Sequence, residues 1–259
     1  MSAKPATVLH IEGRDVGITR PEKLLFPRDG ITKGDVIRYF ERVSRWMLPH
    51  LRGRPLAMQR FPGGIDGGGF FQKAAAKYYP EWIRTATVPK AGGTVTHVIC
   101  DDAATLVYLA NQACITPHIW LSQVDEPWQP DQMVFDLDPS TSDLSRVIRG
   151  AQLLQEILEG MDLPAYVKAT GSRGLHVVVP LRRERNFDEV RAFVRQIAEM
   201  VVNRDPSAFT MEQSKKKRAG RVFIDTNRNA CADGRCPIRD SRQGRSAGGR
   251  SARLGGAEK

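Results

Sequence analysis

The sequence predicts an α+β fold whose second half is a single sheet built in the order βαββαβ. Three observations predict this order. An apolar strand at 132–138 carries two aspartates, apolar residues recur at helical spacing at 144–158 and again at 190–201, and a glycine-containing turn joins two strands within 165–180. A last strand at 221–225 completes the set.

The first half of the chain predicts an N-terminal α/β part. Residues 8–12 and 15–19 predict a hairpin. Thr32 followed by Asp35 is typical of a helix start, and the apolar stripe that follows predicts a helix of about 14 residues. The other expected elements are strands at 56–61 and 95–100, a flexible glycine-rich loop at 63–69, a helix capped by Asp101 or Asp102, and an extended segment at 115–121.

The second half is more regular, and each element has its own signal. A cap, an apolar stripe and a terminal glycine delimit the first helix, a capping box opens the second, and small turn residues separate the two middle strands. These signals are Ser142 and Gly160 for the first helix, Asn186 and Glu189 for the second, and residues 171–174 for the turn between strands at 165–170 and 175–180.

Four polar residues are expected on one face of this sheet. Side chains alternate between the faces of a strand, so Asp136 and Asp138 share a face, with Cα atoms roughly 6.5 Å apart. In the expected topology the first and third strands are central, the fourth flanks the first, and both helices cover one side. If the apolar residues of each strand face the helices, the open face carries Asp136, Asp138, His176 and Asp225.

This open face predicts a site for divalent cations. Carboxylates that stand together repel one another, and a bound cation offsets that repulsion. Three carboxylates beside a histidine form the arrangement that two-metal nucleotidyl transfer requires. The turn at 170–176 adds hydroxyls, backbone N–H groups and cations suited to phosphate oxygens. The alternatives are a solvated strand end and an ordinary glycine turn with a surface arginine.

Three weaker signals lie in the first half of the chain. Lys23 and Lys33 stand near a helix start, where they either hold a phosphate or are solvated surface lysines. Phe70 and Phe71 follow the glycine-rich loop and either stack on exposed bases or pack in the core. His118 is either a structural histidine or a contact residue.

Composition limits the class of protein. With 259 residues, of which 41% are hydrophobic, the chain can form one large or two small globular units. No apolar run approaches the roughly 18 residues of a membrane span, which predicts a cytoplasmic protein. Four cysteines without paired CxxC spacing predict neither a disulfide framework nor a zinc ribbon. The net charge of +10 favours a polyanionic partner such as nucleic acid, and half of this excess lies within 226–259.

Short motifs follow one another along the chain in a specific order. They occupy residues 23–27, 30–33, 51–55, 69–73, 134–139, 174–177 and 222–225. In this order they resemble the polymerase domain of bacterial DNA ligase D, the non-homologous end-joining polymerase within the archaeo-eukaryotic primase superfamily. The resemblance runs from about Thr19 to Ala230.

The resemblance implies a template-dependent DNA/RNA primase-polymerase that acts on broken DNA ends. It implies a two-metal site for Mn²⁺ or Mg²⁺ and a primase-polymerase fold over 1–230, with an N-terminal α/β part at 1–125 and a catalytic part at 126–230. The implied substrates are DNA ends with a 5′-phosphate and NTP or dNTP. Ku and an ATP-dependent DNA ligase are the candidate partners.

By position, the resemblance also implies three sets of site residues. The catalytic metal ligands are Asp136, Asp138 and Asp225. The nucleotide contacts are Thr170, Ser172, Arg173, His176 and Arg218, and the DNA contacts are Lys23, Lys33, Phe70, Phe71 and His118.

The chain departs from the family pattern in three places. Arg20 stands where the family usually has Asn, and Gln59 stands where a Lys commonly reaches the nucleotide. After Cys231 no motif matches, and the basic tail at 231–259 is expected to be disordered or to result from a shifted reading frame. An end-binding module with impaired catalysis is therefore the alternative function. A sugar-nucleotide transferase that uses Asp-x-Asp is disfavoured by the βαββαβ order.

Overall fold

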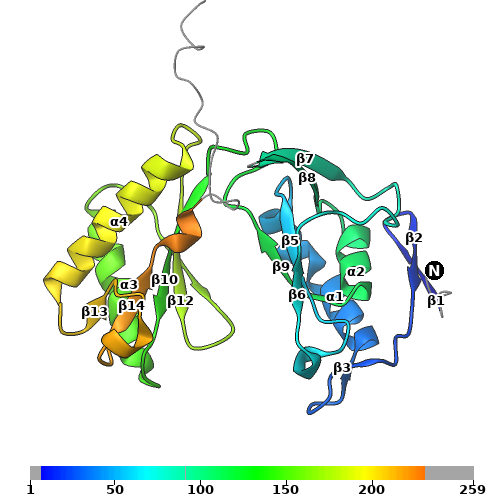
Figure 1. The fold of residues 1–259 in the computed structure, drawn as a ribbon, viewed down its shortest axis with the longest axis horizontal. Helices are drawn as coiled ribbons and strands as arrows, with labels where there is room; N and C mark the ends of the chain where they lie inside the picture. The colour runs from blue at the N-terminus through cyan, green and yellow to red at the C-terminus, as the bar shows by residue number, and fades with distance from the viewer. Residues whose placement is uncertain (1–6, 91, 231–259) are drawn as a thin grey trace, which may run out of the picture.

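The computed structural model describes residues 7–90 and 92–230 and divides them into two lobes. The N-terminal lobe contains β1 (Thr7–Ile11), β2 (Arg14–Ile18), β3 (Leu24–Phe26), β4 (Ile31–Thr32), α1 (Lys33–Leu51), β5 (Leu56–Arg60), η1 (Ile65–Gly67), β6 (Phe70–Gln72), β7 (Thr85–Lys90), β8 (Gly93–Val98), α2 (Ala103–Asn111) and β9 (Cys114–Ile119). The C-terminal lobe contains β10 (Gln132–Asp138), α3 (Leu144–Glu159), β11 (Tyr166–Ala169), β12 (Leu175–Pro180), α4 (Phe187–Arg204), β13 (Phe209–Thr210), η2 (Lys215–Lys217), β14 (Val222–Asp225) and η3 (Asn227–Asn229). Figure 1 shows the lobes side by side.

Local sequence signals account for most of the N-terminal lobe. The predicted hairpin is confirmed as β1 paired antiparallel with β2. Thr32 caps α1 and forms a capping box with Asp35, as predicted. The helix has 19 residues, longer than expected, because its buried stripe continues through Leu48 and Leu51. Asp102 caps α2. These helices and strands enclose one of two hydrophobic cores, which lies within residues 11–114.

Two segments of this lobe differ from the sequence expectations. The strand expected at 95–100 is present as β8, but it forms an unexpected hairpin in which β7 pairs with β8 from Thr85 opposite Val98 to Lys90 opposite Gly93. The β7 segment carries mostly threonine, proline and lysine, so it lacks a clear apolar alternation. The expected flexible loop at 63–69 contains the 3₁₀ turn η1, flanked by Gly64 and Gly68, both with positive φ.

The C-terminal lobe is built on a five-stranded sheet in the order β11-β12-β10-β14-β13. Its central strand β10 runs antiparallel to both β12 and β14. The sheet differs from the expected unit by one short strand, because β13 follows α4 and pairs parallel with β14. Phe209 in β13 is fully buried against Gly150 of α3, where a Cβ would come within 2.8 Å of the ring.

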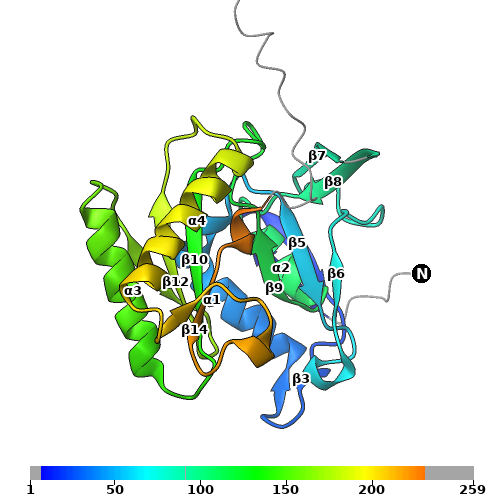
Figure 2. The same cartoon turned by 60° about the vertical axis from the view of Figure 1, so that its left-hand side comes forward.

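Helices α3 and α4 cover one face of this sheet and leave the other face turned toward the N-terminal lobe (Figures 1 and 2). The apolar residues of the strands, such as Phe135 and Val177, lie in the second hydrophobic core with both helices. The predicted capping box of α4 is confirmed. The predicted cap of α3 was wrong. Asp143, and not Ser142, caps the helix, since its carboxylate accepts hydrogen bonds from the backbone N–H and hydroxyl of Ser145.

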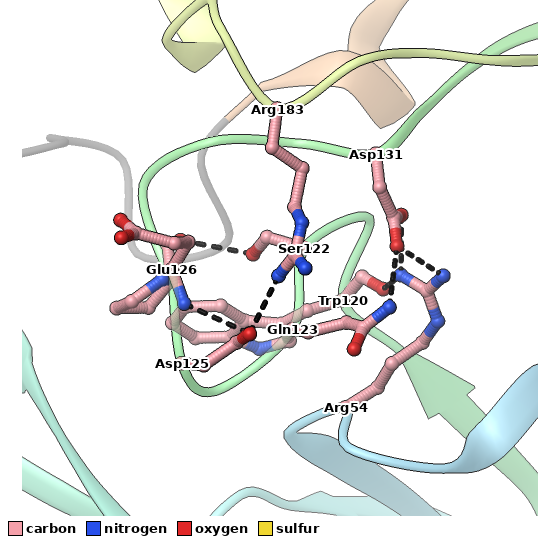
Figure 3. A network of polar contacts seen from close by, with 9 residues as sticks. Arg54, Trp120, Ser122, Gln123, Asp125, Glu126, Asp131 and Arg183 are labelled. Carbon is pink, nitrogen blue, oxygen red and sulfur yellow. Dashed lines mark hydrogen bonds and ion pairs between the residues drawn. The ribbon is translucent and has the colours of Figure 1, made fainter.

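The segment that joins the lobes is fastened to both of them, as Figure 3 shows. Arg54 of the N-terminal lobe donates two hydrogen bonds, of 2.7 and 2.8 Å, to Asp131 just before β10. Gln123 donates a third hydrogen bond to the same carboxylate. On the other side, Arg183 of the C-terminal lobe pairs with Asp125 at 2.7 Å. The two lobes are therefore held in a defined relative position by ion pairs.

Some expectations concern features beyond this description. The basic tail predicted at 231–259, with Cys231 and Cys236, lies outside the described residues. Within 7–90 and 92–230, no helix has both the length and the apolar character needed to cross a lipid bilayer.

Candidate active site

The open face of the five-stranded sheet carries a row of four polar residues, one from each of four adjacent strands. Asp225 of β14 lies opposite Asp136 of β10, which lies opposite His176 of β12, which lies opposite Lys168 of β11. Asp138 lies two residues along β10 on the same face. The structure thus brings together all four polar residues expected on this face. It adds Lys168, which the alternation of its strand could have indicated.

The carboxylate of Asp136 is the most contacted member of this row. Arg228 of η3 donates a hydrogen bond of 2.5 Å from Nε to its Oδ2. His176 Nε2 lies 3.3 Å from the same oxygen, at an angle poor for hydrogen bonding. Burial by itself would raise the pKa of Asp136, but its contacts with His176 and Arg228 outweigh burial and lower that pKa. Asp136 is therefore held as an anion.

For Asp138, the effects that raise the pKa outweigh those that lower it. Burial raises its pKa, and the negative charges of Asp136 and Asp225 raise it further. This is the mutual repulsion that a divalent cation relieves, and carboxylate oxygens are ligands that Mg²⁺ and Mn²⁺ prefer. The donor set fits such a cation.

The carboxylates of Asp136, Asp138 and Asp225 do not form a ready cation site in the structure. Among the residues that the structure describes, no three His, Cys, Asp or Glu side chains are grouped as a metal site. The reason lies in their protein partners. Asp136 is paired with Arg228, and Asp225 accepts a 2.7 Å hydrogen bond from the backbone N–H of Asn227. Side-chain rotation is needed for the three aspartates to share a cation.

A small pocket of about 170 Å³ opens beside Asp138. It is lined by Asp138, Pro139, Thr170, Ser172, Arg173, Gly174, Lys215 and Arg218. Four of the five residues predicted as nucleotide contacts therefore lie around one cavity, while His176 lies in the aspartate row. Lys215 is an addition, and the run of three lysines before Arg218 could have indicated it.

Two structural features shape this pocket. The turn is closed by Thr170, whose hydroxyl donates a 2.9 Å hydrogen bond to the carbonyl of Gly174. A Cβ at Gly174 would come within 2.8 Å of the Leu137 carbonyl, so only glycine lets the turn approach β10 so closely. Arg218 is buried, donates to the carbonyls of residues 212 and 213, and stacks 3.9 Å from the ring centroid of Phe223.

A second, larger cavity of about 770 Å³ lies in the N-terminal lobe and is lined by both Lys23 and Lys33. Lys33 is 5% exposed and donates to Thr19 Oγ1 at 3.0 Å and to the carbonyl of Asn111 at 3.2 Å. Burial and the nearby charge of Arg20 lower its pKa to about 8. Lys23 is half-buried and donates to the Pro62 carbonyl. Neither lysine is a freely solvated surface residue.

Arg20 also lines this cavity, at the position where the sequence departs from the family pattern. Its φ of 46° lies in the left-handed region, which asparagine and glycine adopt more readily than arginine. The guanidinium adds a cation to the cavity.

The aromatic pair lies exposed on the N-terminal lobe. Phe70 and Phe71 of β6 are 48% and 59% exposed, which excludes the core-packing alternative. The ring of Phe71 lies 5.1 Å from that of His118, and Gln59 lies 3.2 Å from the same histidine. Burial, and next the charge of Arg228, lower the pKa of His118. The N-terminal lobe thus presents Phe71 and His118 side by side.

Comparison with known proteins gives a consistent result. The family model described as the LigD primase-polymerase domain matches residues 32–234. The chain is 31% identical to the Mycobacterium tuberculosis multifunctional non-homologous end joining DNA repair protein LigD, over 83% of this chain and 30% of that protein. It is 31% identical to the Bacillus subtilis bifunctional non-homologous end joining protein LigD, over 80% of this chain and 33% of that protein. The chain thus spans about a third of the length of these relatives.

The fold is also similar to a solved structure, the polymerase domain of Mycobacterium tuberculosis ligase D in complex with DNA. The TM-score is 0.79 at 29% sequence identity, over 84% of this chain and 79% of the solved chain. The family model begins at residue 32, so it covers α1 to η3 and with them the aspartate row, but not β1 to β3 or Lys23. The chain belongs to the family of LigD primase-polymerase domains.

Proposed function

We propose that the chain is a template-dependent nucleotidyltransferase that fills or extends DNA ends during double-strand break repair by non-homologous end joining. The observation that carries this proposal is the juxtaposition of three aspartates with a small pocket of hydroxyls and cations on one open sheet face. The family supports it, since its named relatives are end-joining proteins. The βαββαβ arrangement, extended by β13, would serve as the catalytic sheet.

Asp136, Asp138 and Asp225 would hold Mn²⁺ or Mg²⁺. When bound, the cations would lower the pKa of the primer 3′-hydroxyl, which attacks the nucleotide α-phosphate as pyrophosphate leaves, and would offset the negative charge of the triphosphate and of the pyrophosphate. The two carboxylates on β10 are rigidly placed by a buried central strand, and Asp225 is directly opposite one of them. This gives a donor set fixed by sheet pairing and adjustable only by side-chain rotation.

The pocket beside Asp138 would bind the triphosphate. Thr170 and Ser172 offer hydroxyls, and Arg173, Arg218 and Lys215 offer positive charge. Within the described residues Nη1 of Arg218 donates no hydrogen bond, which leaves it for a phosphate oxygen. His176, beside Asp136, would contact the nucleotide from the row itself.

The N-terminal lobe would hold the DNA. Lys23 and Lys33 would bind the 5′-phosphate in the large cavity, where burial strengthens a charge pair with phosphate. The exposed rings of Phe70 and Phe71 would stack on bases, and His118 would steer the template. The DNA in the similar solved structure supports this assignment. NTP or dNTP, Ku and an ATP-dependent DNA ligase would be the other partners, and the cytoplasm the place of action.

The test is primer extension on a gapped duplex with a 5′-phosphate, with Mn²⁺ and ribonucleotides. Wild type, Asp136→Asn and the matched control Glu199→Gln would be compared, because Glu199 is an exposed carboxylate on the outer helix α4 whose one ion-pair partner among the described residues is Arg195. Extension by wild type and Glu199→Gln, but not by Asp136→Asn, is the expected result. Failure of wild type to extend, with retained binding to phosphorylated ends, would favour the end-binding module.

A further inference from the structure

Arg228 is a cation placed directly against the aspartate row. Its Nε contacts Asp136 Oδ2 at 2.5 Å, and this is its single hydrogen bond among the described residues. The Asp136 carboxylate is 9% exposed while the Arg228 side chain is 47% exposed. The carboxylate is therefore largely shielded from solvent, whereas the guanidinium has solvent on its other side.

The backbone of Arg228 is anchored to the strand that carries its partner. Asn229 is fully buried, and its side-chain amide both donates to and accepts from the backbone of Val134, two residues before Asp136. From the other side, Arg191 of α4 donates to Asn227 at 3.2 Å. These contacts hold η3 over β10, so the arginine is built into the site.

We infer that Arg228 sets the cation affinity of the aspartate cluster, by occupying Asp136 until a divalent cation takes its place. This inference rests on the proposed function, because it assumes that the cation binds Asp136. A hard cation and a guanidinium repel each other and compete for the same oxygen. Cation binding must therefore break a charge-assisted hydrogen bond of the kind that is stronger than neutral ones.

The half-exposed side chain makes this exchange feasible. Because Arg228 is anchored through its backbone and not through the guanidinium, the side chain can swing toward solvent without moving η3 or β10. A neutral residue at this position would remove the cation that contacts Asp136 and would leave that carboxylate oxygen open to a divalent cation.

The experiment is calorimetric titration of the full chain with Mn²⁺ alone, without nucleotide or DNA. Wild type, Arg228→Gln, Arg228→Lys, Asp136→Asn and the control Arg191→Gln would be compared, with circular dichroism to establish folding. Arg191 contacts the same 3₁₀ turn but not the aspartate, so its removal tests a general charge effect. Arg228→Met is the second variant in case Arg228→Gln does not fold.

We expect Arg228→Gln to bind Mn²⁺ about tenfold more tightly than wild type does, because the cation no longer has to displace a charge-assisted hydrogen bond from Asp136. Arg228→Lys should return within about threefold of wild type, since its charge remains, and Arg191→Gln should bind as wild type does. If Mn²⁺ binding is lost in Asp136→Asn but Arg228→Gln binds Mn²⁺ no more tightly than wild type, the inference about Arg228 is wrong and the proposed metal site is still supported. Absence of Asp136-dependent binding in both proteins would overturn the two together.

Discussion

Asn229 extends the pairing of the central strand β10 beyond the end of its neighbour β14. The last residue pair between β10 and β14 is Asp136 with Asp225. Further along β10, the Asn229 side chain accepts from the Val134 N–H at 2.8 Å and donates to its carbonyl at 2.7 Å. We predict that Asn229→Ala destabilises the fold and disturbs the position of Arg228.

The size of the effect follows from the groups left behind. Val134 is 4% exposed, so its N–H and carbonyl would lose their partners in a place that water barely reaches. The Thr226 carbonyl, which also accepts from the amide of Asn229, would keep a second hydrogen bond from the Asn229 backbone. Two buried polar groups at about 1–3 kcal/mol each give a loss of about 3 kcal/mol after partial relaxation. For a chain of this size the melting temperature should fall by roughly 6–12 °C.

Denaturation by urea and by heat, followed by circular dichroism, would measure this loss. Asn227→Ala is the matched control, because Asn227 lies in the same 3₁₀ turn but is exposed, with a side-chain contact only to Arg191. The control should stay within about 0.5 kcal/mol of wild type. An Asn229→Ala protein within 1 kcal/mol of wild type, an order-of-magnitude threshold, would refute the view that this amide completes the strand.

Three further predictions concern the two cavities and the junction between the lobes. Affinity for a 5′-phosphorylated end, measured by fluorescence anisotropy, should fall about tenfold from pH 7 to pH 9 because Lys33, with a pKa of about 8, loses its charge; Lys33→Met should bind weakly and show no such slope. Arg54→Met should lower the free energy of unfolding, measured in urea, by about 3 kcal/mol, because it leaves the Asp131 carboxylate, only 15% exposed, without its partner. The loss should be smaller when Asp131→Asn is already present, and additive losses from the two substitutions would contradict a direct interaction. Gly174→Ala should raise the nucleotide KM at least about tenfold, because the methyl group meets the Leu137 carbonyl; an unchanged KM in extension assays would show that the turn is not part of the nucleotide pocket.

Sequence reasoning succeeded where the physical signal is local. The period of two along β10 is enough to place Asp136 and Asp138 on the face opposite Phe135, and the same rule applied to β12 and β14 places His176 and Asp225. Capping boxes depend on residues three positions apart, so the starts of α1 and α4 were also predictable. The start of α3 was not, because neighbouring Ser142 and Asp143 are both good caps and only the backbone conformation chooses between them.

Other features of the site depend on residues that are distant in sequence. Arg228 and Asp136 are 92 positions apart, so no local sequence pattern predicts their contact. Lys33 was expected either to hold a phosphate or to be a solvated surface lysine, and Phe71 either to stack on bases or to pack in the core. Side-chain burial distinguishes these alternatives, and it depends on the packing of the whole lobe.

The sequence by itself determined most of the succession of helices and strands, the two faces of the five-stranded sheet and, through its motifs, the family. The tertiary structure alone showed that β13 adds a fifth strand beside β14, that Lys23 and Lys33 share a cavity, and that the guanidinium of Arg228 contacts Asp136. The physical reason is the distance along the chain over which each effect acts. Backbone propensity and side-chain alternation act over a few residues, whereas burial and charge pairing depend on chain segments that only the folded protein brings together.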